Sequence, residues 1–250
     1  MNEYTKNLSR IEFIVTMGCT GRCRHCSEGS HDFGGEHIDG ELAAKAVTEV
    51  CGYYVIKSLM TFGGEPLLYP ETICAIHRAA KAAGIPLREI ITNGYFSKDS
   101  SRIKEVAKML ADSGVNRVLL SVDAFHQETI PLEPVICFAE AVKDTGVLIE
   151  LSPAWLKSPH HDNPYNNETR RLLKIFTDKS FGVADGNIIF PQGNAKVLLA
   201  EYFDGETDMA NPYEDDPRDI HSLCFEPDGS VLGGNICDTD IMDIIRNYKP

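Results

Sequence analysis

The feature that most constrains the fold of this chain is a regular alternation of short apolar runs and longer amphipathic segments. The apolar runs have the length and composition of strands, and those at residues 118–120 and 188–190 are continuously apolar. Strands that are buried on both faces of a parallel sheet have this character. The predicted strands cover residues 11–16, 58–62, 88–92, 117–122, 147–151 and 187–190.

Amphipathic segments fill the gaps between these runs and predict helices. Asp39 is placed to cap the first of them, because its carboxylate can accept hydrogen bonds from the free N–H groups of the first turn. Gly84, Gly114 and Gly146 directly follow three others, and glycine readily adopts the left-handed conformation that ends a helix. The predicted helices cover residues 40–56, 71–83, 98–113, 133–145 and 165–179.

Six β–α units form either a partial barrel or an open doubly wound sheet, and the pattern alone does not choose between them. After residue 200 the alternation breaks. A Pro-Asp-Gly turn at residues 227–229 joins two short apolar runs, at residues 223–225 and 230–232, and predicts a β-hairpin followed by a helix over residues 238–248. We therefore expect two units, residues 1–200 and residues 201–250.

The charge of the chain limits its partners. Its 250 residues carry a net charge of −13, which makes a nucleic acid a poor partner. Residues 201–219 hold eight acidic residues against Arg218 alone, so this acidic connector contributes −7, as a solvated surface segment would.

The compartment is expected to be cytoplasmic, with no membrane partner. No apolar run approaches the roughly 18 residues of a membrane span, and the first ten residues lack the pattern of a signal peptide. In a reducing compartment, the eight cysteines are expected to bind metal or to be buried thiols rather than to form disulfides.

Three cysteines lie within eight residues, directly after the first predicted strand. Cys19, Cys23 and Cys26 therefore lie at the carboxyl end of that strand, where ligands gather in parallel α/β proteins. Three thiolates at this spacing can hold an iron–sulfur cubane, and the lack of a fourth cysteine in the loop leaves one iron open. The triplet alone also allows a zinc site, with His25 or His31 as the fourth ligand.

A Gly63-Gly64-Glu65-Pro66 motif ends the second predicted strand. In isolation it would be an ordinary strand-ending turn. Combined with the Cys-x3-Cys-x2-Cys spacing, it resembles the paired signature of the radical S-adenosylmethionine (SAM) superfamily. The resemblance implies a partial (β/α)6 TIM-like barrel with a small C-terminal hairpin-and-helix appendage. It also implies one 4Fe–4S cluster, bound by Cys19, Cys23 and Cys26.

The same resemblance implies which residues contact SAM. Glycines let the backbone approach the SAM amino group, Glu65 can help to orient that ammonium, and His25 takes the place of an aromatic residue beside the adenine. Polar residues after the third and fourth strands take the place of contacts to the ribose and carboxylate, although strand-end capping also explains them. The implied SAM contacts are His25, Gly63, Gly64, Glu65, Asn93, Ser121 and Asp123.

The chain departs from its apparent family in two ways. No arginine lies between Arg117 and Arg170, so the usual partner of the SAM carboxylate is unassigned. The tail, including residues 191–195, resembles a degenerate SPASM/twitch-type region, but it lacks the cysteine that would follow the Pro-Asp-Gly hairpin. Cys224 and Cys237 fall off the expected spacing, and two thiols do not complete a cubane, so we expect a single cluster.

The implied activity is reductive cleavage of SAM to a 5′-deoxyadenosyl radical that abstracts hydrogen from a substrate, while the protein supplies geometry and excludes solvent. The tail favours a peptide or small-protein substrate, and His126 is placed to exchange a proton near the radical. A reductant such as flavodoxin or ferredoxin would dock near Arg22 and Arg24. The alternatives are a glycyl-radical activating enzyme and a non-enzymatic iron–sulfur or zinc module.

Overall fold

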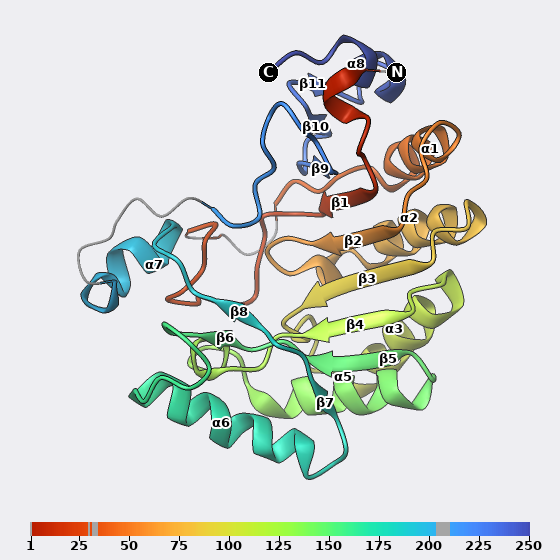
Figure 1. Ribbon diagram of the computed structural model, residues 1–250. Helices are drawn as coiled ribbons and strands as arrows, with labels where there is room; N and C mark the ends of the chain where they lie inside the picture. Colours follow the sequence, from red (N-terminus) through yellow and green to blue (C-terminus); the bar gives the residue numbers. More distant parts are fainter. Residues whose placement is uncertain (1, 30, 32–34, 204–210) are drawn as a thin grey trace.

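Seven strands form one parallel sheet in the spatial order β7-β5-β4-β3-β2-β1-β9 (Figure 1). The computed structural model describes residues 2–29, 31, 35–203 and 211–250. From β1 to β5 each strand lies beside its predecessor and is joined to it by a connection that contains a helix, as parallel pairing requires. The arrangement is the predicted partial TIM-like barrel. Its strands are β1 (Arg10–Ile14), β2 (Ser58–Phe62), β3 (Leu87–Thr92), β4 (Arg117–Leu120), β5 (Leu148–Leu151), β7 (Gly182–Val183) and β9 (Ser222–Phe225).

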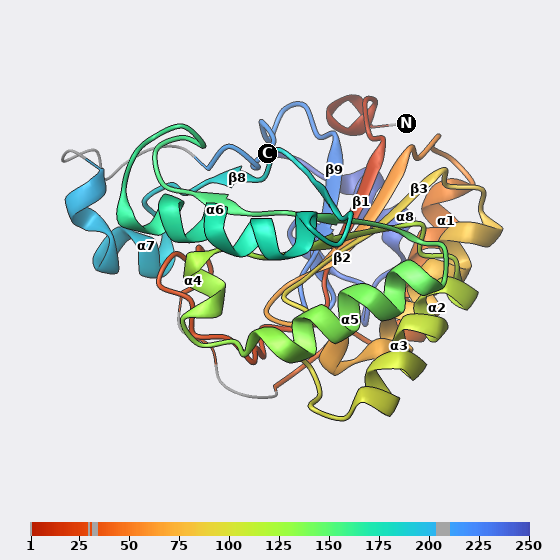
Figure 2. The ribbon, with the colours of Figure 1, turned by 90° about the horizontal axis from the view of Figure 1, so that it is seen from below.

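Four helices, α1, α2, α3 and α5, cover one face of this sheet (Figure 2). Asp39 caps α1 by accepting hydrogen bonds from two N–H groups of its first turn, as predicted. Gly84, Gly114 and Gly146 have φ angles of +79°, +100° and +82°, which confirms the predicted helix stops. The long helices are α1 (Gly40–Cys51), α2 (Pro70–Ala82), α3 (Ser100–Ser113), α5 (Leu132–Asp144) and α6 (Pro164–Thr177).

Short helices occupy several of the connections and the tail. None of the helices within the described part of the chain is long and apolar enough to cross a membrane. The short helices are η1 (Glu3–Thr5), η2 (Pro66–Leu68), α4 (Ala124–Gln127), α7 (Gly193–Leu198), η3 (Ala200–Tyr202) and α8 (Ile241–Asn247).

The two faces of the sheet differ in character because successive strand residues point to opposite sides. Ile11 and Phe13 of β1 are fully buried in the hydrophobic core beneath the helices, and the Phe13 ring stacks on Phe225 of β9 with centroids 4.6 Å apart. Arg10 and Glu12 alternate with them and project from the face away from these helices. The core therefore lies on one side of the sheet.

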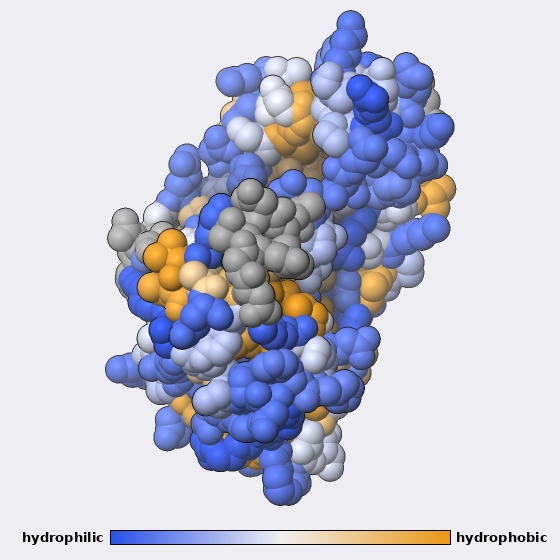
Figure 3. Space-filling model, turned by 60° about the vertical axis from the view of Figure 1, so that its left-hand side comes forward, coloured by the Kyte–Doolittle hydropathy of each residue, from blue (hydrophilic) through white to orange (hydrophobic). Residues whose placement is uncertain are grey.

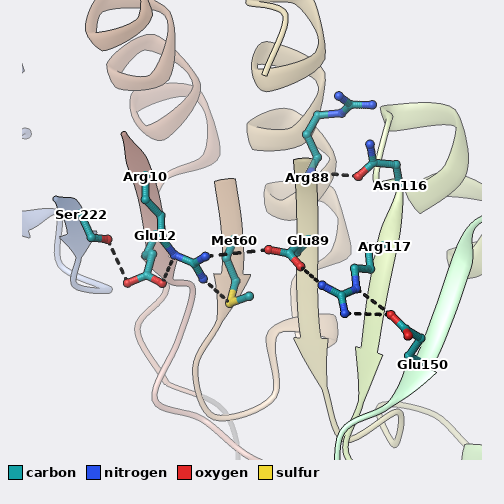
Figure 4. A network of polar contacts seen from close by, with 9 residues as sticks. All are labelled: Arg10, Glu12, Met60, Arg88, Glu89, Asn116, Arg117, Glu150 and Ser222. Atoms are coloured by element: carbon teal, nitrogen blue, oxygen red, sulfur yellow. Dashed lines mark hydrogen bonds and ion pairs between the residues drawn. The ribbon is translucent and has the colours of Figure 1, made fainter. Parts of the chain in front are cut away.

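A ladder of charges crosses the opposite face (Figure 4). Glu89 on β3 lies 2.9 Å from Arg117 on β4 and 3.9 Å from Arg10 on β1. Arg117 also pairs with Glu150 on β5 at 2.8 Å, and Arg10 pairs with Glu12 at 2.6 Å. The Glu89 side chain is only 4% exposed whereas that of Arg117 is 29% exposed, so the ladder is a partly accessible polar surface.

The sixth strand differs from the prediction. The strand that follows β5 in the sheet is β7, while the predicted segment at residues 187–190 contributes β8 (Asn187–Ile188) to a separate two-stranded sheet with β6 (Ala154–Trp155). The apolar run there serves a second, smaller core, in which Ile189 packs near Phe125. β7 consists of only two residues, both of which are exposed, so no apolar run marks it in the sequence.

The predicted hairpin of residues 223–225 with residues 230–232 is wrong. β9 instead pairs in parallel with β1, because the free edge of β1 and the Phe13 ring accept its buried residues. The hairpin is formed by β10 (Ser230–Val231) and β11 (Gly234–Asn235) and is followed by α8. The division at residue 200 stays a prediction. Part of the acidic connector (residues 204–210) lies outside the described residues.

Candidate functional site

A cavity of about 130 Å³ opens where the carboxyl ends of the first strands meet. Eight of the ten residues predicted to bind the cluster or SAM line this cavity. The other two, Glu65 and Asp123, are fully buried and do not line it. The eight are Cys19, Cys23, His25, Cys26, Gly63, Gly64, Asn93 and Ser121.

The three predicted cluster ligands share this cavity. Cys19 and Cys23 are buried and Cys26 is half-buried, and all eight cysteines of the chain are free thiols. Burial raises the pKa of Cys19 to about 11 and raises that of Cys23 further. The thiols are therefore neutral in the metal-free protein, and a metal must displace their protons to bind. Sulfur donors of this kind suit iron–sulfur clusters or zinc.

The Gly63-Gly64 turn packs directly on the backbone that precedes Cys19. Gly63 has a φ of +139°, and a Cβ there would lie 2.5 Å from the carbonyl oxygen of Thr16. A Cβ on Gly64 would lie 2.3 Å from the carbonyl oxygen of Gly18. The Gly64 N–H donates to the Thr16 carbonyl at 2.8 Å. Glycine is therefore required here by the neighbouring backbone, and the contact fixes the start of the cysteine loop, residues 19–29.

Glu65 does not line the cavity but links the ends of β2 and β3 through hydrogen bonds. Its Oε1 accepts hydrogen bonds from the Thr92 hydroxyl at 2.7 Å and the Leu67 N–H at 2.9 Å. Its Oε2 accepts from the Asn93 N–H at 2.9 Å. Burial raises the pKa of Glu65 to about 7, although these hydrogen bonds oppose the shift. The carboxylate thus holds Thr92 and Asn93, which line the cavity.

Asp123 has the same kind of role at the end of β4. Its Oδ1 accepts hydrogen bonds from the Phe125 and His126 N–H groups, both at 3.0 Å, and so caps α4. Its Oδ2 lies 2.8 Å from His126 Nδ1 and accepts from the Ala154 N–H at 3.0 Å. Burial would lower the pKa of His126, but the Asp123 carboxylate outweighs this effect and raises it. Asp123 therefore orients the imidazole that lines the cavity.

Histidines gather beside the cysteines. Single donor atoms of Cys23, His25 and His126 lie within 4.8 Å of one another, and Cys26 Sγ lies 3.0 Å from His31 Nε2. Burial lowers the pKa of His25 to about 4, so this ring is neutral. Its Nδ1 is buried and has no hydrogen-bond partner among the described residues. By donor chemistry alone, the site fits an iron–sulfur cluster or zinc.

Sequence analysis did not single out Thr92 and Asn194 as functional residues. Thr92 lines the cavity and donates to Glu65, and its position at a strand end was the available signal. Asn194 contacts the cysteine loop from a distant part of the chain. No local pattern could have revealed that contact.

Comparisons with known proteins identify the family and its sequence relatives. A family model described as the Radical SAM superfamily matches residues 13–147. The probable GTP 3′,8-cyclase of Methanocaldococcus jannaschii is 24% identical over 127 residues, which cover 51% of this chain and 40% of the relative. The GTP 3′,8-cyclase of Paracoccus denitrificans is 25% identical over 175 residues, which cover 65% and 48%. The chain thus spans less than half the length of these curated relatives.

Solved structures match the fold over nearly the whole chain. The structure of anSMEcpe with bound AdoMet has a TM-score of 0.61 at 18% identity, and the match covers 96% of this chain and 77% of that one. Streptococcus suis SuiB bound to the precursor peptide SuiA has a TM-score of 0.60 at 13% identity, covering 97% and 68%. At such low identity, these similarities establish the fold alone.

Proposed function

Because the chain belongs to the radical SAM superfamily, we propose that it binds one 4Fe–4S cluster through Cys19, Cys23 and Cys26 and cleaves SAM reductively. The observation that carries this proposal is that the three thiols line one cavity together with Gly63 and Gly64. When bound, the reduced cluster supplies the electron that breaks a C–S bond of SAM and yields a 5′-deoxyadenosyl radical. The protein's part is to bind, orient and shield the reactants.

The polar residues predicted to contact SAM divide into two groups. Asn93 and Ser121 line the cavity with polar side chains. His25 Nδ1, which has no hydrogen-bond partner in the described part of the chain, supports a contact with the adenine. Glu65 and Asp123 do not line the cavity but bind residues that do. Glu65 accepts a hydrogen bond from the Asn93 N–H, and the Asp123 carboxylate contacts the ring of His126. We propose that this second group positions the cavity residues rather than touching SAM.

The proposed substrate is a peptide or small protein. The fold similarity to Streptococcus suis SuiB bound to the precursor peptide SuiA extends over 97% of the chain, tail included. The accessible charge ladder also fits a polar chain. A net charge of −13 disfavours a nucleoside triphosphate, because like charges repel. Hydrogen abstraction from peptides, but not from GTP, is the expected result of a substrate screen.

The proposed reductant is a flavodoxin or ferredoxin that docks beside the cysteine loop. Arg22 is exposed there. Its guanidinium donates to the neutral carbonyls of Cys19 and Gly21 at 2.9 and 2.7 Å. The Arg24 guanidinium donates to the Tyr165 hydroxyl and lies 4.0 Å from Glu128, whose carboxylate offsets its charge. We therefore propose that Arg22 supplies most of the local positive charge for docking.

Anaerobic reconstitution tests the cluster and the activity together. We expect about four irons and four sulfides per chain, and formation of 5′-deoxyadenosine with SAM and dithionite. Cys23→Ala should abolish both. The matched control is the double change Cys224→Ala, Cys237→Ala, which should keep all of the iron if a single cluster is present.

Three outcomes would count against the proposal. Stoichiometric zinc without iron uptake would favour the zinc module. Iron that is insensitive to SAM would favour an electron-transfer module. Loss of about half the iron in the double variant would reveal an auxiliary cluster in the tail.

A further inference from the structure

The short helix α7 lies directly against the cysteine loop, although the two are far apart in the sequence. The Asn194 N–H donates to the Cys26 carbonyl at 2.9 Å. The Asn194 side-chain amide donates to the carbonyls of Cys23 and Gly29, each at 3.1 Å. One residue therefore satisfies three carbonyl groups of the loop that carries the predicted cluster ligands.

Gly193 makes this contact possible. Its φ is +53°, and a Cβ there would lie 2.2 Å from the Ser27 carbonyl oxygen and 2.5 Å from that of Cys26. No side chain fits in this space, so the two backbones meet directly. The Gly-Asn pair is thus shaped to the cysteine loop by both sterics and hydrogen bonding.

A second set of hydrogen bonds, made by Arg24, also joins the cysteine loop to this part of the chain. The Arg24 guanidinium donates to the hydroxyl of Tyr165 on α6 and to the Leu198 carbonyl at the end of α7, the latter at 3.4 Å. The Tyr165 ring stacks on Phe125 with centroids 4.6 Å apart, which fixes it in the smaller core. The segment from α6 to α7 therefore contacts the loop at two places, through Asn194 and through the partners of Arg24.

The start of the loop is well held, since the Arg22 guanidinium donates to the carbonyls of Cys19 and Gly21 at 2.9 and 2.7 Å, but residues 23–29 have only weak backbone hydrogen bonds of their own. These bonds, from Cys26 N–H to the Cys23 carbonyl and from Gly29 N–H to the Cys26 carbonyl, are both long at 3.3 Å. A glycine-containing loop of this kind must otherwise be ordered by the metal at an entropic cost. Contacts from a neighbouring segment reduce that cost by fixing the ligands in advance.

We infer that Asn194 is a positioning residue for the cluster site, which holds the Cys23 and Cys26 part of the loop in place before any metal binds. The inference rests on the proposed cluster function. It also extends the site beyond residue 147, where the family-model match ends. Loss of the Asn194 side chain should leave the fold intact, while the cysteine loop opens more often and releases the cluster faster.

The first experiment compares Asn194→Ala and Asn194→Asp with the control Asn247→Ala, which removes an exposed amide from α8. Under anaerobic conditions, a chelator should remove iron on the order of tenfold faster from Asn194→Ala, which corresponds to about 1.4 kcal/mol. Asn194→Asp should be worse still, because a carboxylate would face two carbonyl oxygens. Circular dichroism verifies the fold, and Asn194→Ser replaces any variant that does not fold.

A second measurement needs no cluster. In metal-free protein, iodoacetamide should alkylate Cys23 and Cys26 several-fold faster in the Asn194 variants, as followed by mass spectrometry. Gly193→Ala should act in the same direction. Its control, Gly233→Ala, has the same left-handed strain at φ +76° but meets no atom within 4 Å.

The results separate the two proposals. If wild-type protein takes up no iron, the cluster function fails, while the alkylation rates still test the loop. If both Asn194 variants match Asn247→Ala within about twofold in iron release and alkylation, the positioning role is overturned.

Discussion

At the scale of single residues, the two buried acids of the site act through their neighbours. Glu65 and Asp123 are both fully buried and lie behind the cavity wall. Each accepts several hydrogen bonds from the backbone, and each fixes a residue that lines the cavity, Asn93 in one case and His126 in the other. A buried carboxylate that is fully hydrogen-bonded in this way organises local structure.

Replacement of Glu65 tests that role. In wild type, Glu65 accepts hydrogen bonds from three donors. In Glu65→Gln, the amide NH₂ group, itself a donor, must face one of them, so the free energy of unfolding should fall by about 1–3 kcal/mol. Burial raises the pKa of Glu65 from 4.5 to about 7, so the folded protein binds this proton more tightly than the unfolded chain. Wild-type stability should therefore fall as pH rises from 4.5 through about 7, and the variant should show a flatter profile.

Urea unfolding across that pH range measures both effects. Glu133→Gln, at an exposed position of α5, is the control and should change neither stability nor slope appreciably. If Glu65→Gln behaves like this control, Glu65 does not hold the ends of β2 and β3 together.

At the scale of elements, neighbouring strands are joined by side chains as well as by backbone hydrogen bonds. The charge ladder links β1, β3, β4 and β5 on the face away from the helices α1, α2, α3 and α5 (Figure 4). Its central member, Glu89, is nearly buried and depends on Arg117 at 2.9 Å, since Arg10 is 3.9 Å away. Removal of one partner leaves a buried charge without compensation.

We therefore expect Arg117→Ala to lower the free energy of unfolding by about 1–3 kcal/mol, between the values for exposed and buried pairs. The double change Arg117→Ala, Glu89→Gln should cost less than the sum of the two single changes, because the uncompensated charge is gone. Urea unfolding of the four proteins in this cycle gives the coupling energy. Strict additivity would mean that the ladder does not stabilise the sheet.

At the scale of the whole molecule, electrostatics oppose the proposed encounter with an acidic reductant. The net charge is −13, and the face toward the carboxyl ends of the strands is mostly hydrophilic with small hydrophobic patches (Figure 3). Local positive charge beside the cysteine loop must then overcome a general repulsion if docking is to be fast. Arg22 is exposed at that position.

Arg22→Glu should slow reduction by a flavodoxin on the order of tenfold at low salt, because steering depends on charge near the docking point. Reduction by dithionite should change little. Arg171→Glu, at an exposed position of α6, serves as the control. Equal slowing with both reductants would mean that the charge acts on the cluster potential or the fold. No slowing at all would mean that the partner docks elsewhere. Stopped-flow absorbance follows both reactions.

The sequence by itself determined the features that depend on nearby residues: the alternation of strands and helices, the capping residue Asp39, the glycine helix stops and the cysteine triplet. Local periodicity and spacing encode these features directly. Only the tertiary structure decided that β9 pairs with β1, that β7 rather than residues 187–190 is the sixth strand of the sheet, and that Asn194 meets the cysteine loop. Each of these features depends on contacts between segments that are far apart in the sequence. Different segments can pair with the same free strand edge or the same carbonyl groups, and the local pattern does not determine which of them does so.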